Sequence, residues 1–122
     1  MIYADTDFFI ALFKESDWLK EPALRALEQY HGQLWTSVAT LVELLLLSSR
    51  YGLDPQKALR DVALLADVRN ADLRSFFLAA RFMRRFGLRP LDALHAALCG
   101  DDPILTSDAV FERVGLQRIP LE

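Results

Sequence analysis

The chain has few of the residues that build cross-links and metal sites of the Cys/His type. It contains one cysteine, Cys99, among 122 residues, so no disulfide can form within the chain. Its two histidines, His31 and His95, together with that cysteine are too few for a structural zinc site. A single thiol suits a reducing compartment, and we therefore expect a cytoplasmic protein.

Long apolar stretches are also missing. No segment approaches the roughly 20 consecutive apolar residues of a membrane-spanning helix, so we expect no membrane association. Asp5 and Asp7 interrupt the first apolar segment, which argues against a secretory signal. Hydrophobic residues make up 52% and charged residues 25% of the chain, a balance typical of a globular protein. The length fits one domain over residues 1–122.

Basic residues are slightly outnumbered by acids overall, 14 against 17, but are concentrated in one segment. The net charge is -3, which by itself argues weakly against nucleic-acid binding. Between Arg69 and Arg89, however, six arginines stand against one acid, Asp72. Two interpretations stay open, because these arginines could form a solvated helix face or bind the phosphates of a polyanion. The candidates for phosphate contact are Arg81, Arg84, Arg85 and Arg89.

Short β-prone segments alternate with longer helical patterns. Strands are expected at about 2–4, 34–36, 103–106 and 117–119, with a weaker one around 68. Helices are expected at about 6–13, 17–31, 37–51, 55–66, 72–86, 91–99 and 108–114. Thr6 or Asp7 is expected to cap the first helix, and Ser16 or Asp17 the second. The alternation predicts an α/β fold with three layers, α/β/α, and a short central parallel sheet.

Four carboxylates are expected at one edge of that sheet. Asp5 directly follows the first strand, and Asp108 follows the late strand. Glu43 lies two turns into the helix after the second strand, and Asp92 lies in the first turn of its helix. Each acid alone has a simpler interpretation, since Asp92 and Asp108 suit helix N-termini and Glu43 suits a solvated polar strip. Open parallel sheets nevertheless place their sites outside the carboxyl ends of the strands, where these acids would meet.

Carboxylates gathered in one crevice point to a metal ion. They repel one another and cannot all stay ionised unless a cation neutralises them. Oxygen ligands suit Mg²⁺ or Mn²⁺ rather than zinc. Such an ion typically serves phosphate chemistry, because it lowers the pKa of a bound water and neutralises charge on phosphoryl oxygens. The arginines of the basic segment would then bind the flanking phosphates.

The helix expected at 37–51 is apolar on nearly all sides. Its buried stripe is expected to consist of Val38, Leu41, Val42 and Leu45. The run Leu44–Leu47 adds more apolar surface than one face of a domain can bury. We therefore expect a homodimer through this helix or through 55–68, or else an interface for another protein.

Four segments, in order along the chain, resemble the motifs of PIN-domain ribonucleases. They are Ile2–Leu12 with Asp5, Thr36–Val38 followed by Glu43, Pro90–Ala97 with Asp92, and Leu105–Asp108 with Phe111. The third of these is the most specific. The match covers the whole chain, whose size and simple architecture are most similar to VapC-type toxins of prokaryotic toxin–antitoxin pairs. Asp7 departs from the family pattern, in which serine or asparagine is commoner at this position.

The resemblance implies a PIN-like fold and a function. Asp5 and Asp92 would contact Mg²⁺ or Mn²⁺ most directly, and Asp108 would complete the site or a second metal position. Glu43 would act through a water held by the metal, or orient it. The implied activity is endonucleolytic cleavage of single-stranded RNA, leaving 3′-hydroxyl and 5′-phosphate ends. The implied partner is an antitoxin whose tail enters the acidic groove and often presents an arginine.

Neighbouring side chains are expected in supporting roles. Thr6, and either Thr106 or Ser107, fall where the family often places hydroxyl groups. His95 follows Asp92 by one helical turn and could hydrogen-bond it, so we expect His95 to pack or orient rather than to react.

Two other interpretations are compatible with much of the pattern. A phosphoacceptor receiver domain has a similar length and acids after its first strand, but it needs a lysine near a late strand, and no lysine follows Lys57. A PIN-like fold could also serve only as a binding module, although an unused carboxylate cluster would be unfavourable. Nothing in the sequence resembles a base-reading motif, so the RNA target is not predicted.

Overall fold

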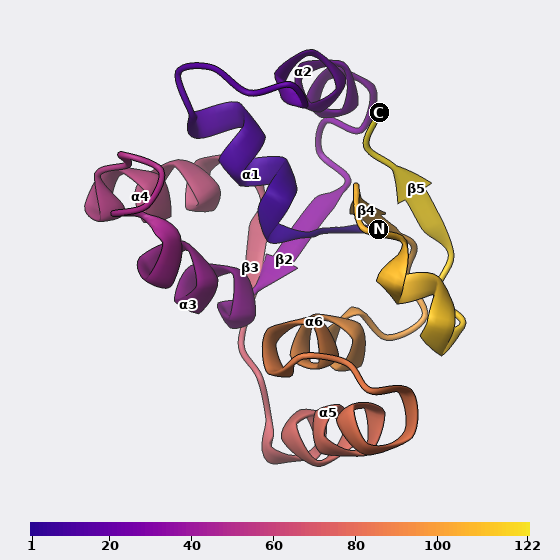
Figure 1. Ribbon diagram of the computed structural model, residues 1–122. Helices are drawn as coiled ribbons and strands as arrows, with labels where there is room; N and C mark the ends of the chain where they lie inside the picture. Colours follow the sequence, from indigo (N-terminus) through magenta and orange to yellow (C-terminus); the bar gives the residue numbers. More distant parts are fainter.

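A five-stranded sheet forms the centre of the computed structural model, which describes residues 1–122 (Figure 1). The strands are β1 (Ile2–Ala4), β2 (Leu34–Ser37), β3 (Asp67–Arg69), β4 (Ile104–Thr106) and β5 (Arg118–Pro120). The helices are α1 (Thr6–Phe13), α2 (Lys20–Gln29), α3 (Val38–Leu47), α4 (Pro55–Leu65), α5 (Leu73–Phe86) and α6 (Pro90–Cys99), with a 3-10 helix, η1, at Ala109–Val114. The weak strand expected around residue 68 is therefore present as β3.

The sheet is entirely parallel, with the strand order β3-β2-β1-β4-β5. Helices α1, α2 and α4 cover one face, and α5, α6 and η1 cover the other (Figure 1). Helix α3 contacts both α1 and α6, so it lies where the two helical layers approach each other. The predicted three-layer α/β/α fold with a short parallel sheet is confirmed.

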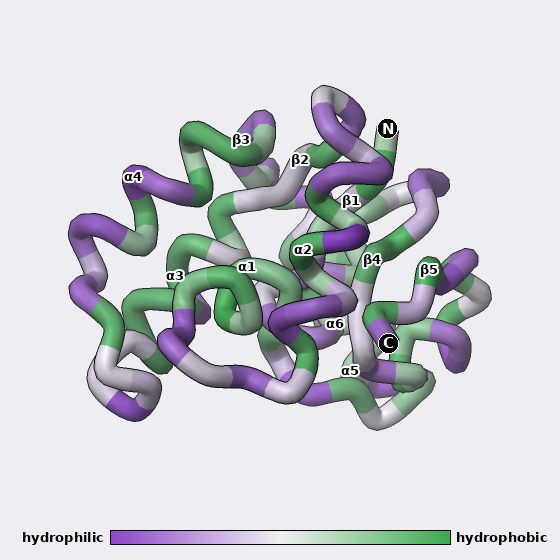
Figure 2. The backbone as a smooth tube through the Cα atoms, turned by 90° about the horizontal axis from the view of Figure 1, so that it is seen from above, coloured by the Kyte–Doolittle hydropathy of each residue, from purple (hydrophilic) through white to green (hydrophobic).

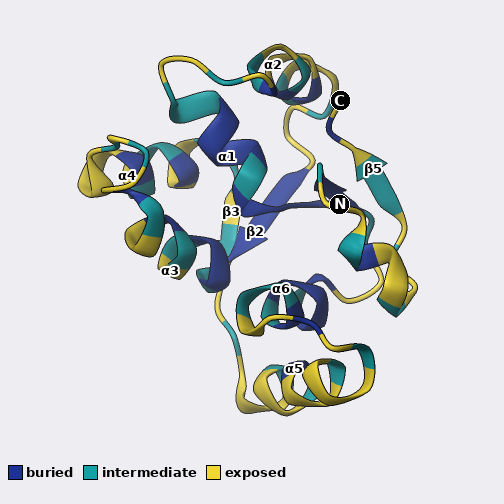
Figure 3. Cartoon of the chain, in the orientation of Figure 1, coloured by how far each residue is buried: buried dark blue, intermediate teal, exposed yellow.

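Alternation along β1 divides the core into two halves. Ile2 and Ala4 pack with α1, α2 and α4, whereas Tyr3 packs with α5 and α6. The same alternation separates Leu34 from Trp35 on β2. All of these side chains are buried, and the central strands are dark blue in Figure 3. Sheets covered on both faces need apolar residues in both directions, which explains the continuous hydrophobic strands.

Two of the expected helix starts are wrong. Asp5 itself caps α1 by accepting a hydrogen bond from the Thr6 amide, so neither Thr6 nor Asp7 is the cap. Helix α2 begins only after Leu19 and has no side-chain cap. Asp17 instead accepts a hydrogen bond from the Leu19 amide, which forms a turn before the helix. In both places several polar residues compete for one cap, and the direction of the incoming chain decides between them.

Helix α3 is shorter than expected and faces the core with other residues. It ends at Leu47, and the chain then turns to Gly52, which has a φ of 65°. Its buried residues are Ala39, Thr40 and Leu44, so the expected stripe is wrong. The outward face leaves Val42, Leu45 and Leu46 exposed by 48%, 54% and 67%. Much of α3 is accordingly hydrophobic in Figure 2, although part of it points away from the core.

No helix of the structure is long and apolar enough to cross a membrane.

Candidate metal centre

The four acids singled out in the sequence line a single cavity. Asp5, Glu43, Asp92 and Asp108 come from four separate segments and meet where β1 and β4 end. The cavity has a volume of about 440 Å³. Its other lining residues are Thr6, Asp7, Ile10, Leu47, Tyr51, Ser107 and Ala109. Acids separated by up to about a hundred positions in the chain are therefore brought together at the carboxyl edge of the sheet, as expected.

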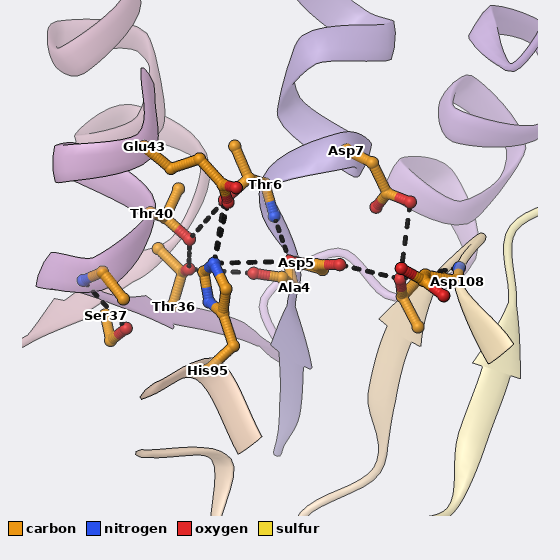
Figure 4. Close-up of polar contacts among 12 residues, drawn as sticks. Ala4, Asp5, Thr6, Asp7, Thr36, Ser37, Thr40, Glu43, His95 and Asp108 are labelled. Carbon is orange, nitrogen blue, oxygen red and sulfur yellow. Dashed lines mark hydrogen bonds and ion pairs between the residues drawn. The ribbon is translucent and has the colours of Figure 1, made fainter. Parts of the chain in front are cut away.

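Asp5 lies at the centre of this arrangement (Figure 4). Its Oδ1 accepts a hydrogen bond from the Thr6 amide at 2.8 Å, and its Oδ2 accepts one from Thr106 Oγ1 at 2.8 Å. Burial, followed by the charge of Asp7, raises the pKa of Asp5 to about 7. The carboxylate is therefore fixed in direction but costly to ionise without a cation.

His95 lies beneath the acids and is fully buried. Its Nε2 is 2.9 Å from Glu43 Oε1 and 3.5 Å from Asp5 Oδ1. Its Nδ1 is 2.6 Å from the hydroxyl of Tyr3, which is itself 2.7 Å from Ser37 Oγ. Burial opposes protonation of His95, but the charge of Asp5 and the hydrogen bond to Glu43 outweigh it and raise the histidine pKa.

The hydrogen bond expected between His95 and Asp92 is not formed. The ring of His95 bonds instead to Tyr3, Glu43 and Thr6. The i, i+3 spacing brings the two residues to neighbouring positions of α6, but His95 points into the core beneath β1 while Asp92 lines the open cavity. The difference follows from the amphipathic character of α6, whose buried residues include Ala93, His95 and Ala96.

Glu43 and Asp92 respond differently to the same cavity. Burial disfavours the ionised form of Glu43, but the hydrogen bond and charge of His95 outweigh it and lower the pKa of Glu43. Asp92 has no such partner, so burial and the charge of Asp108 raise its pKa. The alternative interpretation of Glu43, a residue on a solvated polar strip, does not describe its environment, because His95 holds its carboxylate.

Asp108 occupies the rim of the cavity. It is exposed, and its Oδ1 accepts a hydrogen bond from the Val110 amide, which caps η1. Its own amide donates to Thr106 Oγ1 at 3.0 Å. The same Thr106 hydroxyl thus orders both Asp5 and the backbone of Asp108.

Asp7 is a fifth acid of this cavity. Its Oδ2 accepts hydrogen bonds from the Ser107 amide at 2.8 Å and from the Ser107 hydroxyl. Its Oδ1 is buried and has no hydrogen-bond partner. Burial raises the pKa of Asp7 despite the Ser107 hydrogen bonds. The sequence predicted hydroxyl support at Thr106 or Ser107, and both residues provide it, one for each of the two aspartates.

A second group of hydroxyls was missed by the sequence analysis. Thr36 Oγ1 lies 2.7 Å from Thr40 Oγ1, which lies 3.5 Å from Thr6 Oγ1. Tyr3 joins the same region through His95. The signal that could have found them was spacing in the sequence, since Thr40 and Thr36 precede Glu43 by three and seven residues.

The four arginines proposed to contact phosphates are all exposed, and none forms an ion pair. Arg81, Arg84 and Arg85 belong to α5, and Arg89 stands at the N-cap of α6. Arg89 is also close enough for its charge to favour ionisation of Asp92. Arg89 is therefore the one of the four whose charge acts on an acid of the cavity.

The donor set fits a hard divalent cation. Single ligand atoms of Asp5, Glu43 and His95 all lie within 4.8 Å of one another. The His95 ring is engaged on both nitrogens, so the carboxylates are the groups that remain free to bind. Carboxylate oxygens beside a buried, unpartnered Asp7 oxygen are the environment that Mg²⁺ or Mn²⁺ would neutralise.

Comparison with known proteins agrees with this architecture. Residues 2–116 match the family model described as the PIN domain. A toxin–antitoxin complex from Klebsiella pneumoniae is similar over 100% of this chain and 98% of that one, with a TM-score of 0.78 and 17% identity. VapC20 of Mycobacterium tuberculosis, described as a sarcin-ricin loop cleaving toxin, is similar over 95% and 96%, with a TM-score of 0.77 and 22% identity. FitAcB of Neisseria gonorrhoeae is similar over 99% of this chain and 98% of that one, with a TM-score of 0.76 and 16% identity. No curated protein matches significantly by sequence.

Proposed function

Because this chain belongs to the PIN domain family, we propose that it is a Mg²⁺- or Mn²⁺-dependent endoribonuclease that cleaves single-stranded RNA. The observation that carries the proposal is the convergence of Asp5, Glu43, Asp92 and Asp108 on one cavity. A binding module would gain nothing from a carboxylate such as Asp5, whose pKa is raised to about 7 by burial. The match to the PIN domain also removes the receiver-domain alternative.

We assign the four acids distinct roles. Asp5 and Asp92 bind the cation, since both line the cavity and burial raises the pKa of each carboxyl group, which a cation would offset. Asp108, on the exposed rim, completes the site. Glu43 stays ionised because His95 lowers its pKa, so it accepts a hydrogen bond from the attacking water and orients it.

The protein's own part in the reaction is orientation and charge. Thr106 and the Thr6 amide fix the two oxygens of Asp5, and His95 fixes Glu43. A bound divalent cation lowers the pKa of a coordinated water and neutralises the phosphoryl oxygens. The products would carry 3′-hydroxyl and 5′-phosphate ends.

Removal of the metal and replacement of Asp92 test this proposal. Wild-type protein should cleave an end-labelled single-stranded RNA in Mn²⁺ and lose all cleavage in EDTA. Asp92→Asn should lower the rate by about 100-fold or more, since replacing even the outer partners of metal ligands typically costs 10–100-fold. Asp54→Asn, which replaces the exposed cap of α4, is the matched control and should cleave normally. RNA binding without cleavage by the wild type would support the silent binding module instead.

The four exposed arginines are proposed to bind RNA phosphates. Each phosphate contact on a single strand contributes a slope of about 0.7 to log Kd against log salt concentration. Arg89→Ala should therefore reduce this slope by about 0.7, measured by fluorescence anisotropy in EDTA. Arg60→Ala removes an exposed arginine of α4 and should leave the slope unchanged. Equal slopes for the two variants would assign Arg89 to a solvated surface.

We also propose that the protein acts in the cytoplasm as the toxin of a toxin–antitoxin pair. One similar structure is described as a toxin–antitoxin complex and another as a toxin that cleaves the sarcin-ricin loop. The cavity carries five carboxylates, which would receive a basic side chain of an inhibitory partner. A basic group in that position would occupy the place of the cation and so block cleavage.

A homodimer through α3 is the assembly we propose. Its outward side chains Val42, Leu45 and Leu46 are 48%, 54% and 67% exposed, and Leu64 on the neighbouring α4 is 78% exposed. Apolar side chains this exposed favour burial against a second protein surface. The dimer face could extend from α3 onto α4.

Leu46→Glu should convert such a dimer into a monomer. A charge placed in an apolar interface costs several kcal/mol when it is left unpaired. Sedimentation velocity should show wild-type dimer and variant monomer at the same concentration, with identical circular dichroism. A wild-type species of 13.9 kDa at high concentration would exclude the homodimer.

A further inference from the structure

Helix α5 leaves two aromatic rings in water. Phe76 and Phe77 are 51% and 69% exposed, whereas Phe82 and Phe86 of the same helix pack against the core. Helix α6 lies between α5 and the sheet, so α5 has a free outward side, which is largely yellow in Figure 3. Aromatic side chains contribute strongly to cores and interfaces, so two adjacent exposed rings indicate a contact surface.

The charge of α5 has one sign. Between Leu73 and Phe86 the helix contains four arginines and no acid, and only its N-cap, Asp72, is negative. Asp72 is already engaged by the amide and hydroxyl of Ser75. The four arginines are exposed and form no ion pair, and they are Arg74, Arg81, Arg84 and Arg85. Unpaired positive charge of this density attracts a polyanion.

The rings and the arginines occupy neighbouring stripes of the outward face. Arg74, Arg81 and Arg85 are seven and four residues apart, so they lie in one row along the helix. Phe76 lies on the other side of the outward face, and Phe77 lies between Phe76 and the arginine row. A single-stranded nucleic acid presents the matching pair of features, a row of phosphates beside a row of bases with free π-faces.

This surface leads towards the acidic cavity. The residues Gly87–Arg89 join α5 to α6, so the carboxyl end of α5 meets the amino end of α6, where Asp92 lines the cavity. Arg89 lies in this connection, and its charge favours ionisation of Asp92. Phe77 lies about 14 Å along α5 from its carboxyl end, at about 1.5 Å per residue. A short length of single strand therefore suffices to reach from the rings to the cavity.

A second copy of this chain fits the outward face of α5 less well than a polyanion does. Two such faces in contact would bring unpaired arginines together with no acid of α5 to offset them. Like charges placed opposite each other are unfavourable in an interface. The outward side chains of α3, in contrast, are apolar and uncharged, so the proposed homodimer needs no part of α5.

Resting on the proposed function, we propose that the outward face of α5 is a platform for single-stranded RNA. Phe76 and Phe77 stack on unpaired bases, and the arginine row contacts the flanking phosphates. The platform holds nucleotides beside the cleaved bond, while the bond itself lies in the cavity. Stacking needs an unpaired base but no particular base, so the platform selects single strands without selecting a sequence.

RNA with and without bases tests this assignment. Fluorescence anisotropy in EDTA should compare a labelled single-stranded RNA with an abasic strand of the same length. Phe77→Ala should raise Kd for the RNA by about 5- to 100-fold and leave Kd for the abasic strand unchanged. Phe76→Ala should act in the same direction, whereas Arg81→Ala should weaken both strands alike. Trp18→Ala removes a ring that is 82% exposed but lies outside α5, and it should bind both strands normally.

Two conservative variants separate stacking from general apolar contact. Phe77→Tyr keeps an aromatic ring and should bind RNA as the wild type does. Phe77→Leu keeps an apolar side chain without a π-face and should lose RNA affinity as Phe77→Ala does. Wild-type RNA affinity in Phe77→Leu would overturn the stacking assignment. A change of oligomeric state in Phe77→Ala, measured by sedimentation velocity, would assign the face to protein contact and overturn the platform as well.

The outcomes also separate this inference from the proposed function. In Mn²⁺ the platform predicts that Phe77→Ala raises KM for RNA cleavage and leaves kcat unchanged. Wild-type protein that cleaves RNA, with Phe77→Ala equal to it on both strands, would overturn the platform and leave the nuclease intact. Wild-type protein that binds RNA through Phe77 but does not cleave it would overturn the nuclease and leave the platform. Absence of RNA binding would overturn both.

Discussion

Asp5→Asn should reduce metal-dependent RNA cleavage by about 100-fold or more and, at the same time, stabilise the metal-free protein. The loss of activity follows from the position of Asp5, whose two oxygens lie beside His95 and Thr106 at the centre of the site. The gain in stability follows from its burial, because the asparagine keeps the cap on the Thr6 amide without a buried charge. A gain of about 1 kcal/mol corresponds to roughly 4 °C in the melting temperature.

The raised pKa of Asp5 also predicts how the stability of the metal-free protein changes with pH. Asp5 has a folded pKa of about 7 against an ordinary value of 3.8, so the folded state binds more protons between these values. Stability of the metal-free protein should therefore fall as pH rises from about 4 to 7. The raised pKa of His95 acts in the same direction, since its contribution is complete below 6.5 and is lost as pH rises through the folded value.

Urea denaturation of metal-free protein at pH 6 and pH 8 measures the effect. The wild type should be less stable at pH 8, and Asp5→Asn should reduce this difference. Asp54→Asn replaces another helix-capping aspartate and should behave as the wild type does. Full cleavage activity in Asp5→Asn would contradict the proposed metal centre.

His95→Ala should give the largest loss of stability among the residues of the site. The substitution removes the partner of two buried carboxylates, Asp5 and Glu43, and leaves the Tyr3 hydroxyl with Ser37 alone. Removing one member of a buried ion pair typically costs about 3–5 kcal/mol. The loss should be smaller in Mn²⁺, because a bound cation supplies part of the missing positive charge.

His31→Ala is the control for this measurement. His31 is the other histidine of the chain and is exposed, so its replacement should change the free energy of unfolding by less than about 0.5 kcal/mol. Urea denaturation with and without Mn²⁺ compares the two variants. Equal stability of His95→Ala and the wild type would show that His95 does not stabilise the acids.

The acids were predictable from sequence because the topology decides their position. Asp5 and Asp108 follow parallel strands, so the rule that such strands end at one edge places both at the same cavity. Asp92 needed only the prediction that its helix crosses that edge. The same reasoning found the fold, because short buried strands alternating with helices have few other arrangements.

Side-chain partners were harder to predict, because they depend on which way a buried residue turns. His95 was expected to meet Asp92, one turn away, but meets Glu43 and Asp5 from distant segments. The prediction of which residues of α3 are buried was wrong for a related reason. Nearly all of that helix is apolar, so hydrophobicity could not distinguish buried Leu44 from exposed Leu46.

The hydrogen bond from Thr106 to Asp5 joins positions 101 residues apart. β4 lies directly beside β1 in the sheet, although most of the chain separates them in sequence. During synthesis Asp5 is made early, and its hydrogen-bond donor Thr106 is added only after most of the chain has been made. An unfinished chain therefore has no assembled centre, and the activity proposed for it can appear only after nearly the whole chain has been made.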